Sequence, residues 1–492
     1  MKKLLKITLS LAMAFVCVFS FTACKKQISA TTVSTANVAS TNGVTTNGGV
    51  TAVYGDYLYF INGVKTNDGK NAKDNTRGAI CRVKYNKADG KIDDKTYEVV
   101  VDDLVGYNDC SLYFFGDYMY YATPSSDKNN KATILYNKTK FMRYDLVNKQ
   151  SYALYTTQLN DEKEEISYSY YIVGEELHLV VYEKNNSSIT SLKIDKDVKT
   201  NYVINNATSC VLSENYGNTA SSSVTVDANK FVFYTKGHED VDKDAVQTGN
   251  KVYRTSVKED NSALICDNGE SVSILSIKNG KLIFVLGTNL YANTITGANN
   301  EKLSFSNDKV ISFNYASDQS ILFIENEDGT ISVLYYDSKS FNLNIIKWNN
   351  MELETVTVNE FSKDDKFEFI TTVTVTETEE AEEGVDPVSH EITYLVYINN
   401  KKLYKIEISC DGEYTVFAEP IQLTKTEVVS ATGLLVPEVV GNYVYVYAQN
   451  DDKNTYLYRT DLTIKVNASE LEDEDAQKAT FIGIKEEKDE KK

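Results

Sequence analysis

The chain has few of the residues from which compact catalytic and metal sites are usually built. Its 492 residues include three histidines, seven cysteines, four prolines and one tryptophan. Beyond residue 24, the two cysteines nearest in sequence, at 81 and 110, are 29 positions apart. This spacing excludes the CxxC pairs of zinc and redox motifs, and so low a density does not suit a disulfide scaffold. We expect buried free thiols at Cys81, Cys110, Cys210, Cys266 and Cys410.

Sequence motifs for catalysis are also missing. His238 and His390 are each followed by glutamate, as in the zinc motif HExxH, but aspartate and tyrosine stand at positions 242 and 394, where the second histidine belongs. No GxSxG nucleophile turn, GxxxxGKS/T phosphate loop or GxGxxG dinucleotide turn occurs. We predict no catalytic residue, no cofactor and no metal site, although a site built from distant residues stays open.

Positive charge is scarce relative to negative charge. The chain has 51 lysines and arginines against 70 aspartates and glutamates, a net charge of −19. Residues 1–23 hold three lysines and no acid, so their removal takes the charge from −19 to −22. An acidic chain repels nucleic-acid phosphates and anionic lipid headgroups. We therefore predict no nucleic-acid partner.

Two acidic segments contain the residue types of a cation site. Asp240, Asp242 and Asp244 have the spacing of a calcium loop, but Ala245 and Lys251 occupy the positions where an EF-hand needs glycine and glutamate. The second segment holds Glu377, Glu379, Glu380, Glu382, Glu383 and Asp386. We expect both segments to be solvated loops, with cation binding as the alternative.

The N-terminus carries the clearest pattern in the chain. Three lysines precede an apolar run, 7–21, and the chain continues as Phe21-Thr22-Ala23-Cys24. A basic start, a short apolar run and a small residue before the cleavage point predict a secretory signal peptide over residues 1–23. An uncleaved membrane anchor is the alternative, but it would need about 20 apolar residues.

The residues at this cleavage point resemble the lipobox of bacterial lipoproteins, apart from Phe21, where leucine is commoner. The resemblance implies cleavage between Ala23 and Cys24, acylation of the Cys24 thiol, and an extracytoplasmic protein anchored to the bacterial cell membrane by its lipid. Residues 28–49 are small, polar and nearly uncharged. They predict a lipidated flexible tether over residues 24–49, with a strand that joins the fold as the alternative.

From residue 50 a hairpin pattern recurs eight times. Each copy is an apolar strand, a short polar turn and a strand of alternating aromatic or β-branched residues, as in AVYGDYLYF at 52–60. The predicted turns are centred on Gly55, Gly116, Gly174, Ala228, Asn279, Asp318, Asp365 and Gly441. A third strand follows each hairpin, and in five copies it carries a basic residue: Arg82, Arg143, Arg254, Lys405 or Arg459. A weaker fourth strand closes most copies.

Four short antiparallel strands that recur at turn-to-turn spacings of 39 to 76 residues predict an all-β fold of the β-propeller type. Eight units predict eight blades over residues 50–485, with seven blades as the alternative. Near residues 372–389 we expect an inserted hairpin with an acidic tip. Residues 486–492 are predicted to be a charged, disordered tail.

The repeated motifs G-D-x-I/L-Y-F/Y and L-Y-R/K resemble those of TolB-like propellers and of Gram-positive cell-surface lipoproteins. Gly55-Asp56, Gly116-Asp117 and Leu457-Tyr458-Arg459 carry them here. The resemblance covers most of residues 50–485 and implies a fold and a location but no activity. The S-P-D-G-x-x-I-A-F pattern of TolB is absent, so a TolB-like partner is not implied.

These patterns favour a non-catalytic binding or protein-interaction module whose ligand is a glycan or an envelope protein. The alternative is a glycan-active enzyme with its site in the propeller channel, marked by carboxylates about 5–10 Å apart beside aromatic side chains. We expect the recurring basic residues to pair with acids on the adjacent blade. The tyrosines are expected to pack between blades rather than to stack on sugars.

Overall fold

The computed structural model describes most residues between Gly49 and Ile484, and these lie in one compact unit, Asn37–Lys492. The residues left out between those ends are 64–76, 87–89, 104, 106–110, 126–137, 159–164, 213–230, 238–250, 268–271, 279, 288, 296–300, 306–309, 312–320, 326–330, 338, 348–351, 357–360, 363, 379–388, 410–414, 417–418 and 437–442. The predicted signal peptide 1–23, nearly all of the tether 24–49 and the tail 486–492 lie outside the described residues.

The described strands form eight antiparallel sheets, each built from strands consecutive in the chain, and we number these sheets as blades in chain order. Blade 1 holds β1 (Thr51–Tyr54), β2 (Tyr57–Ile61), β3 (Ile80–Tyr85) and β4 (Ile92–Val101). Blade 2 holds β5 (Tyr113–Phe115), β6 (Tyr118–Pro124), β7 (Thr139–Asp145) and β8 (Gln150–Thr156). Blade 3 holds β9 (Ile166–Val173), β10 (Glu176–Glu183), β11 (Ser188–Ile194) and β12 (Val198–Asn205). Blade 4 holds β13 (Ser209–Val211), β14 (Phe231–Lys236), β15 (Lys251–Ser256) and β16 (Ala263–Asp267).

The second half of the chain repeats this arrangement. Blade 5 holds β17 (Val272–Lys278), β18 (Lys281–Leu286), β19 (Asn289–Thr294) and β20 (Val310–Ile311). Blade 6 holds β21 (Ile321–Glu325), β22 (Ile331–Asp337), β23 (Asn342–Lys347) and β24 (Glu352–Val356). Blade 7 holds β25 (Phe367–Thr378), β26 (Ser389–Asn399), β27 (Lys402–Ser409), β28 (Thr415–Val416) and β29 (Ile421–Gln422). Blade 8 holds β30 (Val428–Val436), β31 (Tyr443–Gln449), β32 (Thr455–Asp461) and β33 (Ala479–Ile482).

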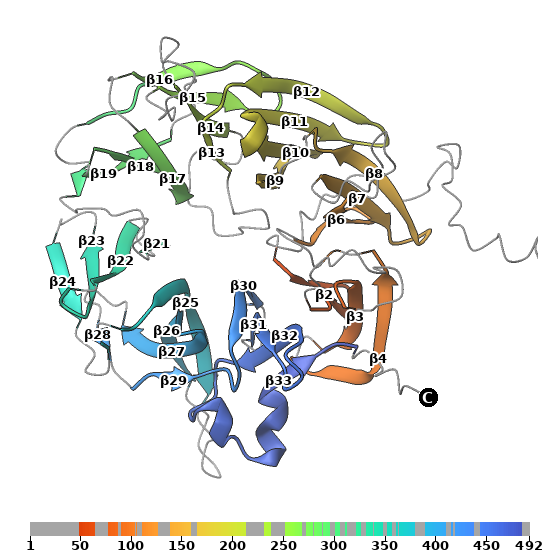
Figure 1. The fold of residues 1–492 in the computed structure, drawn as a ribbon, viewed down its shortest axis with the longest axis vertical. Helices are drawn as coiled ribbons and strands as arrows, with labels where there is room; N and C mark the ends of the chain where they lie inside the picture. The colour runs from red at the N-terminus through yellow and green to blue at the C-terminus, as the bar shows by residue number, and fades with distance from the viewer. Residues whose placement is uncertain are drawn as a thin grey trace, which may run out of the picture. The chain divides into compact units, whose positions relative to one another are not determined.

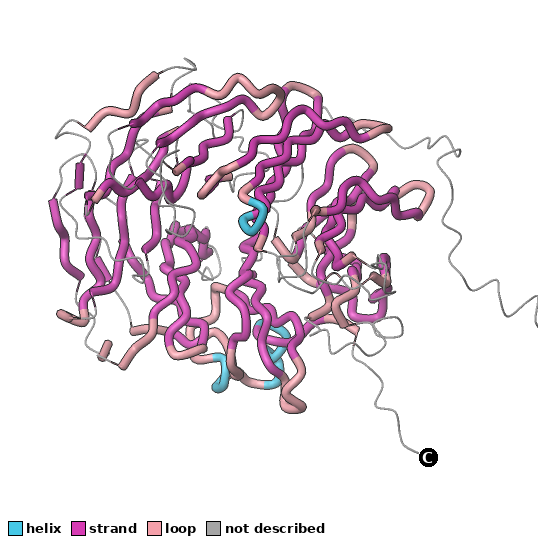
Figure 2. Tube along the Cα trace, turned by 45° about the horizontal axis from the view of Figure 1, so that its top comes forward, coloured by secondary structure: helices cyan, strands magenta, loops and turns pink. Residues whose placement is uncertain are grey.

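The eight sheets are arranged as a β-propeller, so the prediction of an eight-bladed all-β fold is confirmed and the seven-blade alternative is wrong (Figure 1). Strands that open a blade, such as β9, β17 and β25, lie nearest the centre, and closing strands, such as β12 and β24, lie outermost (Figure 1). Strands make up nearly all the regular structure in Figure 2. No helix among the described residues is long and apolar enough to cross a membrane.

The predicted glycine turns open the first three blades. Gly55 joins β1 to β2 with Tyr54 opposite Tyr57, which leaves a loop of two residues, and Gly174 joins β9 to β10 in the same way. Their φ angles are 61° and 69°, in the left-handed region that side chains with a Cβ rarely adopt. The side-chain alternation of each strand is thereby set from its turn, and it places Leu58 and Phe60 in the core.

Blades 4, 6 and 7 differ from the predicted hairpins. In blade 4 the strand paired with β14 is β13, while the predicted first strand, 224–227, lies outside the described residues. In blade 6 the turn predicted at Asp318 also lies outside them, and β21, expected as the second strand, is the first described strand of its sheet.

In blade 7 the chain does turn at Asp365, whose N–H donates to the carbonyl of Ser362 at 3.1 Å, but this turn does not join the first two strands of the sheet as predicted. β25 begins after that residue and pairs with β26 from Phe367↔Asn399 to Thr378↔Ser389. Threonine and valine alternate through residues 372–376, and both favour strands, so the strand simply continues. The acidic hairpin expected near 372–389 is thus the outer end of this blade's own first hairpin rather than an insertion; its segment 379–388 is not described.

Neighbouring blades share apolar cores at the seams between them. Blades 3 and 4 meet through Val180, Tyr182 and Val232, and blades 5 and 6 through Ile283 and Val333. The other seams are filled in the same way, and blades 8, 1 and 2 share one cluster. A single sheet would leave both of its faces in water, so the stability of each blade depends on its neighbours.

The described cysteines are part of these cores. Cys81 and Cys266 are buried and Cys210 is half-buried, and all three are free thiols, as predicted. Burial raises the pKa of Cys81 to about 12, so this thiol stays protonated and acts as a small apolar side chain. Cys110 and Cys410 lie outside the described residues.

Polar contacts close the ring between blade 1 and blade 8. The side-chain amide of Asn62, which is fully buried, donates to the carbonyl of Ile484 at 2.8 Å and accepts from its N–H at 3.1 Å. Tyr447 OH donates to the carbonyl of Ile61 at 3.3 Å. Gly483 lies against the same amide, since a Cβ there would sit 2.0 Å from Asn62 Oδ1. The two ends of the described chain are therefore held together by hydrogen bonds as well as by the shared core.

Asn62→Ala is expected to lower the free energy of unfolding by about 2 kcal/mol, because two hydrogen bonds of a buried amide are lost. Urea unfolding of the soluble chain measures this change. Asn205→Ala, an exposed change on β12, serves as the control and should stay within about 0.5 kcal/mol. Equal stability of the two variants would show that this contact does not hold the ring closed.

Candidate functional site

The five recurring basic residues occupy one position in their blades. Each lies on the third strand with its charged group over an aromatic ring of the second strand. The distances to the ring centroids are 4.2 Å for Arg82 over Tyr57, 4.8 Å for Arg143 over Tyr118, 3.8 Å for Arg254 over Phe231, 3.9 Å for Lys405 over Tyr394 and 4.3 Å for Arg459 over Tyr443. The ring is always two residues before the basic residue's cross-strand partner, so the pair is diagonal.

Three of these residues also form hydrogen bonds to the next blade. Arg143 donates to the carbonyl of Lys196 in blade 3 at 2.8 Å, and Arg459 donates to that of Gly90 in blade 1 at 3.3 Å. Lys405 donates to the carbonyl of Leu462 in blade 8. The expected pairing with acids of the adjacent blade is wrong at these three seams, because backbone carbonyls accept the bonds.

The remaining repeat residues also serve packing. Arg82 bonds to Glu98 and to Tyr59 OH within its own blade. Tyrosine rings meet across blades, with 4.7 Å between the centroids of Tyr113 and Tyr170. The expectation that tyrosines pack between blades is confirmed at this seam. Residues that recur from blade to blade therefore build the ring, and a ligand site has to be sought where blades differ.

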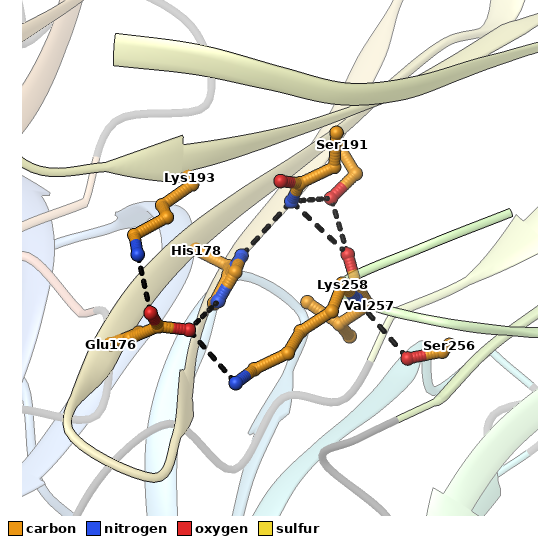
Figure 3. A network of polar contacts seen from close by, with 8 residues as sticks. Glu176, His178, Ser191, Lys193, Ser256, Val257 and Lys258 are labelled. Carbon is orange, nitrogen blue, oxygen red and sulfur yellow. Dashed lines mark hydrogen bonds and ion pairs between the residues drawn. The ribbon is translucent and has the colours of Figure 1, made fainter. Parts of the chain in front are cut away.

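Blade 3 keeps a basic residue at this position but changes its partner. Lys193 occupies the basic position on β11, opposite His178, but the residue two before His178 is Glu176 and not an aromatic. Glu176 pairs with Lys193 and, at 2.8 Å, with Lys258 of blade 4 (Figure 3). An ion pair between two blades thus replaces the cation–ring contact.

Beneath this ion pair lies a buried polar network. His178 is 1% exposed, and its Nδ1 accepts from the Asn201 amide nitrogen at 3.0 Å. Ser191 Oγ donates to the carbonyl of Val257 in blade 4 at 2.6 Å (Figure 3). In blades 2 and 7 a basic residue on the third strand makes the corresponding bond to the next blade. The Asn201 amide also donates to Ser191 Oγ at 3.0 Å. A chain of polar contacts therefore joins the histidine to the seam between blades 3 and 4.

The electrostatics of this network fix the charge of each group. Hydrogen bonds from Lys193 and then Lys258 lower the pKa of Glu176 to about 2. Burial lowers the pKa of His178 to about 4, so the ring is neutral at pH 7. Because an amide nitrogen only donates, the proton of His178 sits on Nε2, which faces Glu176 at 3.7 Å.

A cleft of about 430 Å³ opens at a different seam, between blades 7 and 8. It lies where β25 and β30 begin and where β26 turns into β27. Its lining combines charged and apolar side chains: Lys366, Phe367, Glu368, Ile398, Lys401, Glu427, Val428, Val429 and Gln449. Lys401 Nζ and Glu427 Oε2 meet across the seam at 3.4 Å.

Phe367 belongs to an aromatic cluster behind the cleft. Its ring centroid lies 4.2 Å from that of Tyr336 and 5.4 Å from that of Tyr397, and both rings are within about 30° of parallel to it. Phe361 meets the ring edge-on at 4.5 Å. The aromatic surface of Phe367 is thus largely used by its neighbours, and Val428 and Val429 supply the rest of the apolar lining.

Several residues singled out in the sequence lie outside the described part of the chain: Ala23, Cys24, His238, Asp240, Asp242, Asp244, Glu379, Glu380, Glu382, Glu383 and Asp386. Glu377 is described, and it accepts from Tyr394 OH at 2.9 Å and pairs with Lys465 of blade 8. His390 is exposed on β26. Among the described residues no group of three potential metal ligands comes together.

Sequence reasoning missed both the His178 network and the cleft. One signal for the network was present, since glutamate follows the Gly174 turn where the other clear turns lead to an aromatic residue. The cleft had no such signal, because Lys366 and Glu427 come together only through the seam between blades 7 and 8.

Acidification is expected to weaken the fold through His178. Its pKa is about 4 in the folded protein against an ordinary 6.5, so the unfolded chain binds the proton first. The stabilisation that comes from the neutral form of His178 is complete above pH 6.5 and is lost as the pH falls towards 4. The stabilisation that comes from the charged form of Glu176 is lost only below the ordinary pKa of 4.5 for this group. Urea midpoints measured between about pH 7.5 and 4.5 should fall less steeply in His178→Gln than in the unchanged protein. His390→Gln should keep the original slope, and an equal change in both variants would contradict this assignment.

No family model matches this sequence, and no curated protein matches it. Among solved structures, a prolyl endopeptidase is 10% identical over 70% of this chain and 46% of its own, with a TM-score of 0.41. A post-proline cleaving enzyme from Rickettsia typhi is 13% identical over 87% of this chain and 58% of its own, with a TM-score of 0.39. A protein from Lactobacillus plantarum is 13% identical over 70% and 93%, with a TM-score of 0.34. This chain spans about half the length of the two peptidases, and likeness at this level assigns no activity.

Proposed function

We propose that this chain is an extracytoplasmic lipoprotein, anchored to the bacterial cell membrane through Cys24, whose propeller is a non-catalytic binding module. The Phe21-Thr22-Ala23-Cys24 sequence supports the anchor. The small, polar residues 25–49 would hold the propeller away from the lipid surface. The ligand is a glycan or an envelope protein.

The cleft between blades 7 and 8 carries the binding part of the proposal. Elsewhere the recurring arginines and tyrosines are engaged in holding blades together. In the cleft, by contrast, Glu368, Lys401, Glu427 and Val429 are exposed beside one another. Concave sites that mix apolar surface with a few polar groups are where proteins usually bind ligands.

A glycan-active enzyme is the second candidate, because Glu368 and Glu427 place two carboxylates in one cleft with Phe367. Glycoside hydrolysis needs such a pair, one as acid and the other as nucleophile or base. Glu427 is already paired with Lys401 at 3.4 Å, so this carboxylate is engaged in an ion pair across the seam rather than free to act on a glycosidic bond. This pairing places binding ahead of catalysis.

Ligand binding is tested by incubating the soluble chain, starting after Cys24, with panels of cell-wall and dietary glycans and with isolated envelope proteins. We expect saturable binding without release of glycan products. Glu368→Gln and Glu427→Gln are the variants that separate the candidates. Glycan turnover that falls by a factor of about a hundred or more in either variant would establish the enzyme instead.

The anchor is tested by replacing Cys24 with alanine in the full-length chain. We expect loss of fatty-acid labelling and of the cleaved, lipidated form in the membrane fraction, because the thiol is the acylated group. Cys17→Ala removes a cysteine from the apolar run and should keep both labelling and membrane retention. Unchanged labelling of Cys24→Ala would contradict the lipoprotein assignment.

A further inference from the structure

We infer that the cleft between blades 7 and 8 binds a short extended peptide segment that carries both an acidic and a basic side chain around an aliphatic one. This inference rests on the proposed binding function and narrows its ligand to the peptide chain of an envelope protein.

The charges of the cleft come in both signs and belong to different blades. Lys366, Glu368 and Lys401 lie on blade 7 or next to its strands, and Glu427 directly precedes the first strand of blade 8. Two cations and two anions around one opening match a ligand that also has both signs. A purely anionic or purely cationic ligand would meet repulsion from half of the rim.

The apolar part of the cleft suits an aliphatic side chain better than a sugar. A sugar usually stacks on a free aromatic face, but the ring of Phe367 is already packed against Tyr336, Tyr397 and Phe361. The accessible apolar surface is provided by Val429, which is 49% exposed, above the buried Val428. A volume of about 430 Å³ lies within the usual range for small-ligand sites and limits the bound segment to a few residues.

Lys401 lies at a backbone position that would favour glycine. Asn400 and Lys401 form the two-residue turn between β26 and β27 with φ angles of 47° and 64°. Turns of this kind prefer glycine at the second residue, because a Cβ is disfavoured in the left-handed region. The lysine at this position instead sends a charged side chain across the seam to Glu427. That side chain is a contact that an acidic group of the ligand can use.

The probe is a fluorescent pentapeptide, acetylated and amidated, with the sequence Gly-Glu-Leu-Lys-Gly, measured by anisotropy against the mature soluble chain. Peptides with Lys-Leu-Lys and Glu-Leu-Glu centres are the charge controls. Val429→Asp removes the apolar contact, and Val203→Asp is its matched control, since both valines are 49% exposed. Lys401→Glu combined with Glu427→Lys keeps the ion pair but exchanges its charges. The same exchange at Glu165 and Lys184, a pair at 2.5 Å outside the cleft, is the second control.

We expect the mixed-charge peptide to bind more tightly than both charge controls. Val429→Asp and the exchanged cleft pair should each lower the affinity for this peptide by about fivefold or more, while their urea midpoints stay unchanged. Both control variants should bind the peptide as tightly as the unchanged protein. If the cleft variants bind the peptide as tightly as the unchanged protein does, the peptide binds elsewhere and the inference is overturned. Binding of glycans without any peptide binding would also overturn it while leaving the proposed function standing. Binding in neither the peptide nor the glycan and envelope panels would contradict both.

Discussion

The contact between one blade and the next is the constraint on which this structure depends. A four-stranded sheet has two faces, and each face here is covered by a neighbouring blade. No blade is stable alone, so the seams must be specific as well as apolar. The third-strand arginine or lysine supplies that specificity at three seams by donating to a carbonyl of the adjacent blade. An aromatic ring on the second strand then covers the same charged group, which offsets part of its desolvation.

The seam between blades 3 and 4 meets the same need with different chemistry. Ser191 reaches the carbonyl of Val257, which lies three residues after Arg254 just as Leu462 lies three after Arg459. Lys193 is thereby released from that task and pairs with Glu176 at the surface. This exchange brings the neutral, buried His178 into contact with the seam. When Nδ1 of His178 takes up a proton, it becomes a donor that faces another donor, the Asn201 amide nitrogen. A seam that is insensitive to acid in blades built on arginine thus becomes sensitive in this one.

The sequence was sufficient to predict the architecture because the period of the turns and the alternation within strands are local. Gly55, Gly116 and Gly174 mark turns that the structure contains, and five basic residues mark the third strands. The hairpin predicted around Asp365 was misplaced because threonine and valine follow one another without a break, so the longest hairpin among the described residues looked like two elements. The acceptors of the arginines could not be predicted either, since a backbone carbonyl leaves no trace in the sequence. The cleft was invisible for a similar reason, as its walls come from residues 366–368 and 427–429, which meet only when two blades pack.

The division between repeated and unrepeated residues also explains where a ligand site can form. A residue that holds a seam cannot vary without loss of stability, and Arg143, Lys405 and Arg459 are of that kind. Variation is tolerated where the first strands begin and where the second strand turns into the third, since these positions lie at the ends of the sheets. At blades 7 and 8, Lys401 has a left-handed backbone conformation and Val429 is 49% exposed. Both features cost some stability. A contact between the cleft and a partner would offset that cost, because the partner would cover the valine and engage the lysine.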